Sequence, residues 1–143
     1  MSSKRRDVDL LHRALSEVII WCFYRVYNVL GYGFLGQVYE NSLVVELEKR
    51  GLKVKQQEPV LVYFEDEVVG EFIANIIVED KIILELKTAE TIEEVHLDQL
   101  QNYIVKSPPV RLGYLLNFGP KPTFRRIVLN QSQSSAAVKR DPV

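Results

Sequence analysis

The sequence predicts an α/β (α+β) domain in which one mixed β-sheet is flanked by helices. Apolar residues repeat with helical spacing near the start of the chain and again after Thr91. Between these two regions the apolar period changes to two, which is typical of strands. Two further strand-like runs follow the last helical region. Elements in this order pack most simply as one sheet covered by helices.

Two helices are expected before the first strand. In residues 7–31, Leu11, Leu15 and Val18 begin an apolar series with helical spacing, and Gly31 is the expected stop. Aromatic residues widen the apolar face of this helix, which suggests burial on more than one side, against a second copy of the chain or another protein partner. A glycine-containing segment then leads into a second helix over residues 38–50, ended by Gly51.

Four strands are expected next, within residues 53–57, 60–65, 68–78 and 81–87. Pro59 separates the first two, and acidic turns separate the others. A third helix is expected to begin after Thr91 as its N-cap and to end at Pro108 and Pro109.

Two final strands, within 110–119 and 123–130, are joined by a Gly-Pro-Lys-Pro turn. We therefore expect a single domain over residues 1–130. Ser and Gln dominate from Gln131 onward, which predicts a disordered tail over residues 131–143.

The composition is that of a globular protein and favours a cytoplasmic location. The chain has 143 residues, of which 47% are hydrophobic and 26% charged, and its net charge of −1 excludes an overall basic field. The only cysteine, Cys22, cannot form an internal disulfide and is expected to be a small buried hydrophobe. The longest uncharged run, residues 18–24, is too short to cross a membrane, and no secretory signal is expected at the start.

Three polar side chains are expected to converge beside the hairpin around Asp80. A three-residue turn over 79–81 pairs Asn75 with Glu85, and directly opposite residues share a face of the sheet. Lys87 lies on that face because strand side chains alternate, whereas a two-residue turn would move Asn75 to the other face. A carboxylate and a lysine on one strand can hold Mg²⁺ and stabilise charge during phosphodiester hydrolysis. An isolated Glu-x-Lys is more often a surface ion pair on the solvated face of a strand.

Five segments in this order resemble the GxxExxY family, a branch of the PD-(D/E)XK nuclease superfamily. They are "GYGFLGQVYENSL", "ELEKRGLKVKQQ", "ANIIVEDKIILELK", "HLDQLQNYI" and "GYLLNFG", and the resemblance runs over about residues 31–128. It implies a restriction-endonuclease-like core and metal-dependent nuclease activity with Mg²⁺ or Mn²⁺ as the cofactor.

The resemblance also implies roles for individual residues. Glu85 corresponds to the metal-binding acid of the motif and Lys87 to its lysine. Glu40 corresponds to a helical glutamate that reaches the metal directly or through water. Gln99 and Tyr103 resemble the Q-x-x-x-Y element of RecB-like nucleases, and residues four apart share one helix face. The implied catalytic residues are Glu85, Lys87, Gln99 and Tyr103, and the implied metal ligands are Glu40, Asn75 and Glu85.

Two positions depart from the family pattern. Asn75 stands where the family has an acid before the hairpin, and Gly36 stands where it has the glutamate of its namesake motif. A divalent ion and a carboxylate attract by several kcal/mol even at an effective dielectric of about 20, so the loss of one carboxylate weakens metal binding by orders of magnitude. Glu71, Glu79 and Asp80 offer no obvious replacement. The sequence therefore predicts a degenerate phosphodiesterase site.

Three functions stay open at this point. The first is a magnesium-dependent nuclease. The second is a catalytically silent module that holds nucleic acid, DNA in preference to RNA, through local basic clusters such as Arg125 and Arg126. The third is a protein-interaction or dimeric structural module that uses the first helix.

Overall fold

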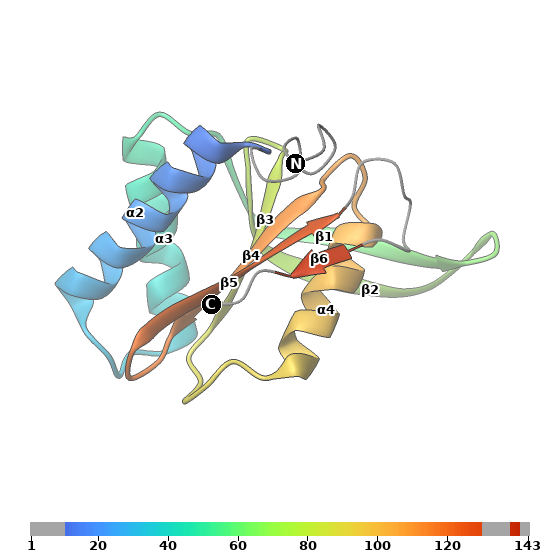
Figure 1. The fold of residues 1–143 in the computed structure, drawn as a ribbon. Coiled ribbons are helices and arrows are strands. Elements are labelled where there is room, and N and C mark those ends of the chain that lie inside the picture. The colour runs from blue at the N-terminus through green and yellow to red at the C-terminus, as the bar shows by residue number, and fades with distance from the viewer. Residues whose placement is uncertain (1–10, 130–137, 141–143) are drawn as a thin grey trace, which may run out of the picture.

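The computed structural model describes residues 11–129 and 138–140. The elements in chain order are α2 (Arg13–Leu30), α3 (Gly36–Lys49), β1 (Val54–Phe64), β2 (Glu67–Val78), β3 (Ile82–Lys87), α4 (Glu94–Val105), β4 (Leu112–Phe118), β5 (Pro122–Leu129) and β6 (Val138–Arg140). The strands form one sheet in the order β1-β2-β3-β4-β5-β6 (Figure 1). Only the β3–β4 pair is parallel among the described strands, so the sheet is mixed and the predicted fold class is confirmed.

Two hydrophobic cores lie on opposite faces of the sheet. One core joins α2 and α3 to alternate residues of the central strands. It includes Phe23 of α2, Leu43 of α3 and Leu84 of β3. The other core joins α4 to the intervening strand residues. It includes Leu100 of α4 and Ile83 of β3. Because neighbouring residues of β3 enter different cores, this strand is buried on both faces and carries almost no polar side chains before Glu85.

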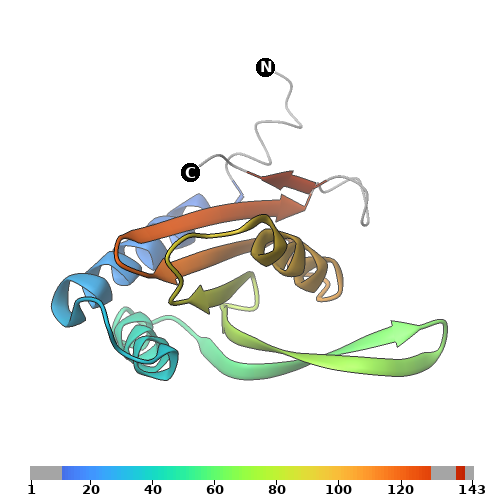
Figure 2. The same cartoon turned by 90° about the horizontal axis from the view of Figure 1, so that it is seen from below.

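The two strands predicted on either side of Pro59 are one continuous strand, β1, so that prediction is wrong. β1 lies at the edge of the sheet, where a proline without an N–H group is tolerated. β1 and β2 continue beyond the sheet as a two-stranded ribbon, drawn in green in Figures 1 and 2. A β-bulge between Val62 and Tyr63 interrupts this ribbon near its tip.

The hairpin between β2 and β3 has the predicted three-residue turn. Ile77 pairs with Ile83, and Val78 pairs with Ile82. Glu79 and Asp80 both adopt positive φ angles of 54°, which lets the chain reverse over so few residues. The predicted register is therefore confirmed as far as Ile76 and Leu84, where the ladder ends, and the predicted Asn75–Glu85 pair is replaced by a hydrogen bond from the Leu86 N–H to Asn75 Oδ1.

The helix boundaries differ in part from the predicted ones. α2 ends at Gly31 with φ 73°, as expected, but its predicted beginning lies partly outside the described residues. α4 begins after Glu93 rather than Thr91, because Glu93 and His96 form a reciprocal capping box. Of the tail predicted over 131–143, only Val138–Arg140 is described, as strand β6, and the rest lies outside the described residues.

Cys22 is fully buried on α2, as predicted. Burial, and then the charge of Glu46, raise the pKa of its thiol to about 11, so the thiolate is scarce at neutral pH. Within the described part of the chain, no helix combines the length and apolar character needed to span a membrane.

We predict that Gly119→Ala destabilises the fold through the end of β4. An added Cβ would collide with the carbonyl oxygen of Ala89, whose backbone N–H and C=O are both held by the buried Asn117 side chain at 2.9 Å. The free energy of unfolding in urea should fall by about 1–3 kcal/mol. Gly70→Ala is the matched control, since a Cβ there meets no atom within 4 Å, and it should change the value by less than about 0.5 kcal/mol. Equal values for the two variants would contradict the prediction.

Candidate functional site

A buried carboxylate lies at the junction of α3, β1 and β2. Glu40 is only 4% exposed, although an ionised carboxylate is costly to remove from water. Its oxygens accept hydrogen bonds from Gln56 Nε2 at 2.6 Å, from Gln57 Nε2 at 2.8 and 2.9 Å, and from Asn75 Nδ2 at 3.0 Å. Gln37 Nε2 donates a longer bond to Oε2 at 3.5 Å, so four side-chain amides solvate this carboxylate inside the protein.

The two glutamines can both reach Glu40 because β1 is distorted at Gln57. Successive residues of a regular strand point to opposite faces, so neighbours should not contact one carboxylate. Gln57 has a φ of 55°, in the left-handed region that non-glycine residues rarely adopt. Its expected partner in β2, Asn75, is also missing from the regular pairing between Gln56–Ile76 and Glu58–Ala74. This local distortion aims both glutamine side chains at α3.

Asn75 uses both ends of its amide. Its Nδ2 donates to Glu40 Oε1 at 3.0 Å, while its Oδ1 accepts from the backbone N–H of Leu86 at 2.9 Å. The opposite orientation would set Oδ1 against a carboxylate and the NH₂ group against an N–H donor, so the network fixes the amide. Asn75 therefore ties β2 to β3 and to α3.

Glu85 follows directly after the buried part of β3 and lies close to Asn75. Burial raises the pKa of its carboxyl from 4.5 to about 7, opposed by a backbone hydrogen bond from Asn75 and by the charge of Lys87, and supported by the charge of Glu40. Its Oε1 is buried and has no hydrogen-bond partner among the described residues. The structure thus places Asn75 against Glu40 and close to Glu85, with Lys87 near enough for its charge to act on Glu85, while the metal and catalytic roles of these residues stay predictions.

The two α4 residues of the predicted site lie differently. Tyr103 stacks on Phe72 of the ribbon, with ring centroids 3.8 Å apart and an interplanar angle of 11°. Burial, and then the charge of Glu85, raise the pKa of Tyr103, which places its hydroxyl within electrostatic reach of the site. Gln99 is exposed one helical turn earlier and makes no hydrogen bond to Glu85 or Lys87. Tyr103 therefore borders the site, whereas Gln99 takes no part in the hydrogen bonds that hold the site together.

The residues present do not fit a divalent cation in this arrangement. Both oxygens of Glu40 accept amide hydrogen bonds, and Oδ1 of Asn75 accepts one from Leu86. Only Glu85 Oε1 is left without a partner. No cluster of three or more His, Cys, Asp or Glu side chains occurs within residues 11–129 and 138–140. A hard cation prefers several oxygen ligands at once. In this site amide hydrogens already occupy the Glu40 carboxylate, which would be the strongest of these ligands.

Sequence reasoning missed Gln56 and Gln57 as members of the site. The signal was present in "KVKQQ", where two neighbouring amides interrupt an alternating strand pattern before Pro59. Two polar neighbours in a strand cannot share a face without a distortion, so the pair itself indicated an irregular strand.

A mixed sheet carries Glu85 and Lys87 on an inner strand, and Glu40 of a flanking helix lies close enough to act on Glu85 by its charge; this arrangement is that of a nuclease-like α/β protein. A model of the PD-(D/E)XK nuclease superfamily matches residues 13–127, and the chain belongs to this superfamily. No match was found among curated proteins or among solved structures. Nucleases of this superfamily generally use divalent metals. Assignment to the GxxExxY branch stays a prediction.

We predict that Glu85 makes stability fall as the pH rises. Its folded pKa of about 7 lies above the unfolded value of 4.5, so the folded state binds more protons between these limits. The free energy of unfolding should therefore decrease from pH 4.5 to pH 7 by on the order of 2–3 kcal/mol from this group. Urea unfolding across this range measures the effect.

Glu85→Gln is the control for that measurement, because it keeps the shape of the side chain and removes the titration. The variant should be more stable than the parent at pH 8 and should lack this decrease. An identical pH profile in the two proteins would show that Glu85 titrates normally.

Proposed function

We propose that the protein is a PD-(D/E)XK nuclease-like protein that associates with nucleic acid but cleaves it poorly or not at all. The observation that supports this most directly is the hydrogen-bonded closure of Glu40 by Gln56, Gln57 and Asn75. In this proposal the amides take the place of the cation that a working phosphodiesterase site would hold.

The closure opposes metal binding energetically as well as sterically. Hydrogen bonds to charged groups contribute about 1.5–3 kcal/mol each. A cation that binds Glu40 must displace such donors and leave buried amide N–H groups unpaired. It would also meet the uncharged Asn75 where a second carboxylate is expected. Both effects lower the affinity for Mg²⁺ or Mn²⁺.

The surface beside Lys87 is where we expect phosphates to bind. Lys87 pairs across the sheet with Asn117, which pairs with Thr123. Thr123 lines a pocket of about 390 Å³ together with Lys121 and Arg125. Glu90 also lines this pocket, so its two cationic side chains lie with one carboxylate. In this proposal Lys87, Lys121 and Arg125 supply the cationic contacts that a phosphate backbone needs.

The ribbon formed by β1 and β2 is unsuited to nucleic acid. Residues 54–78 contain five carboxylates and one basic side chain, Lys55, which pairs with Asp80 at 2.9 Å. The carboxylates are Glu58, Glu65, Asp66, Glu67 and Glu71. Their field repels phosphate, so the proposed path is confined to the side of Lys87, Lys121 and Arg125.

We predict that Asn75→Asp creates a metal site. The change removes the amide donor to Glu40 and adds a third carboxylate near Glu40 and Glu85, so three like charges require a cation. The variant without metal should be less stable than the parent. Mn²⁺ should raise its melting temperature and give binding heat in calorimetry, whereas the parent should show little of either.

Asn28→Asp is the matched control, because it makes the same change at an exposed position of α2 outside the hydrogen bonds to Glu40. It should give no comparable Mn²⁺ effect. Tight Mg²⁺ binding by the parent, with DNA cleavage lost in Glu85→Ala, would contradict the proposed function.

We further predict salt-dependent binding of DNA without turnover. Replacing Lys121 and Arg125 by Gln should weaken binding and lower the salt slope by about one per lost phosphate contact. Fluorescence anisotropy with labelled single- and double-stranded DNA and RNA measures this. Lys53→Gln is the control, since Lys53 is paired with Asp80 at 2.9 Å. Absence of binding to every nucleic acid at low salt would remove this part of the proposal.

A dimeric or protein-interaction function through α2 is the second candidate. Trp21 and Val29 are 49% and 63% exposed, which leaves apolar surface on this helix. The Arg50 guanidinium, however, covers the Trp21 ring at 3.8 Å, so part of this surface already has a partner. Sedimentation equilibrium distinguishes the candidates, because a monomeric mass at high concentration would exclude the dimer.

A further inference from the structure

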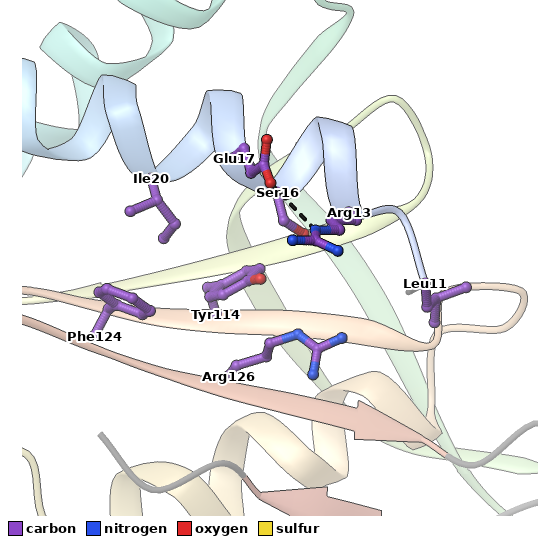
Figure 3. Close-up of a pocket in the computed structure, with 8 residues that line it drawn as sticks. All are labelled: Leu11, Arg13, Ser16, Glu17, Ile20, Tyr114, Phe124 and Arg126. Carbon is purple, nitrogen blue, oxygen red and sulfur yellow. Dashed lines mark hydrogen bonds and ion pairs between the residues drawn. The ribbon is translucent and has the colours of Figure 1, made fainter. Parts of the chain in front are cut away.

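A pocket of about 380 Å³ lies between the start of α2 and strands β4 and β5 (Figure 3). Its floor includes Tyr114, which belongs to the core under α2 and α3. Leu115, the β4 partner of Glu85, belongs to the core under α4. The pocket is therefore on the opposite face of the sheet from Glu85 and independent of the proposed nuclease-like site. Its volume lies within the usual range for small-molecule sites, about 300–1,000 Å³.

Ser16 gives the pocket an unsatisfied polar group. The residue is only 8% exposed, and its Oγ has no hydrogen-bond partner among the described residues. In contrast, Ser42 on α3 donates its hydroxyl to the Val38 carbonyl at 2.7 Å. A buried hydroxyl without a partner costs about 1–3 kcal/mol, and alanine is the better helix former. Fold stability alone therefore does not explain a serine at this position.

Positive charge converges on the same space. Arg13 comes from α2 and Arg126 from β5, and both line the pocket, one on each side of Tyr114 (Figure 3). Glu17 is the only carboxylate of the lining, and it pairs with Arg13 Nε at 3.3 Å. Within the described part of the chain, the first turn of α2 contains no acidic residue and its N-cap makes no side-chain hydrogen bond, so no acid of that turn offsets the positive end of the helix dipole.

The rest of the lining is apolar. Leu11, Ile20 and Phe124 contribute hydrocarbon surface beside the guanidinium groups. A pocket with an apolar wall and a few polar groups at one end is typical of sites for small organic ligands. Inorganic anions alone would leave this wall unused.

We propose that this pocket binds a small amphiphilic anion. Its carboxylate or phosphate head accepts hydrogen bonds from Arg13, Arg126 and the Ser16 hydroxyl, and its short apolar body packs on Leu11, Ile20 and Phe124. Arginine suits such heads because its planar guanidinium donates two parallel hydrogen bonds.

The test uses the full chain and four probes: hexanoate, phenyl phosphate, inorganic phosphate and neutral hexanol. Calorimetry and thermal unfolding should show binding of hexanoate or phenyl phosphate. Comparison of their affinities shows whether the pocket prefers a carboxylate or a phosphate head. Inorganic phosphate and hexanol should each bind at least about tenfold more weakly than the better amphiphile, because each lacks one half of the contacts. Equal binding of hexanol would overturn the proposal.

Ser16→Ala supplies a readout that a merely structural serine would not give. Without ligand the variant should melt at a higher temperature than the parent, because it loses an unsatisfied hydroxyl. The better amphiphile should bind it about tenfold more weakly and stabilise it less. Ser42→Ala is the control and should bind the ligand like the parent.

Arg126→Gln should also weaken binding at least about tenfold, whereas Arg25→Gln, on α2 outside this pocket, should not. Binding of none of the probes by the parent, or equal affinity in the parent, Ser16→Ala and Arg126→Gln, would overturn the proposal.

Discussion

The buried charge of Glu40 is the constraint on which the arrangement of the site depends. A carboxylate at 4% exposure must be compensated by a cation or by hydrogen-bond donors. The chain supplies donors from two strands, and both strands deform locally to do so. Gln57 adopts a left-handed conformation, and Asn75 leaves the regular ladder. Such a conformation costs on the order of 1–3 kcal/mol, which the hydrogen bonds to a charged group are large enough to offset.

The same distortion determines how the ribbon leaves the sheet. Ile76 and Val78 belong to the core under α2 and α3, and period-two alternation would place Ala74 there as well. Ala74 instead belongs to the core under α4, and Phe72 packs against that core and stacks on Tyr103. β2 therefore changes face at Asn75. The site, the bend of β2 and the contact between the ribbon and α4 are consequences of one irregular position.

The sequence was sufficient where local chemistry determines structure and insufficient where distant residues do. The three-residue turn fixed the register, and the register placed Asn75 beside Glu85. The continuous β1 was not predictable, because tolerance of Pro59 depends on its position at the sheet edge. The α4 start was missed because His96 acts as the reciprocal cap of Glu93, a role usually filled by Glu or Gln. The roles of Gln56 and Gln57 required knowledge of where α3 lies.

An amide at position 75 does more than remove a charge. Aspartate could accept the Leu86 N–H, but it could not donate to Glu40, and the two carboxylates would repel each other. Asparagine forms hydrogen bonds with both neighbours. At this position an amide therefore favours the stability of the metal-free protein, whereas a carboxylate would favour affinity for a metal. The pocket beside α2 shows the converse condition, since the Ser16 hydroxyl has no partner among the described residues. Where the fold satisfies its own polar atoms a ligand must compete with the protein, and where it leaves them unsatisfied a ligand completes the hydrogen bonding. On this reasoning the proposed loss of cation binding follows from the satisfied oxygens of Glu40, whereas Glu85 Oε1 and Ser16 Oγ are the atoms whose hydrogen bonding a proton or a ligand would complete.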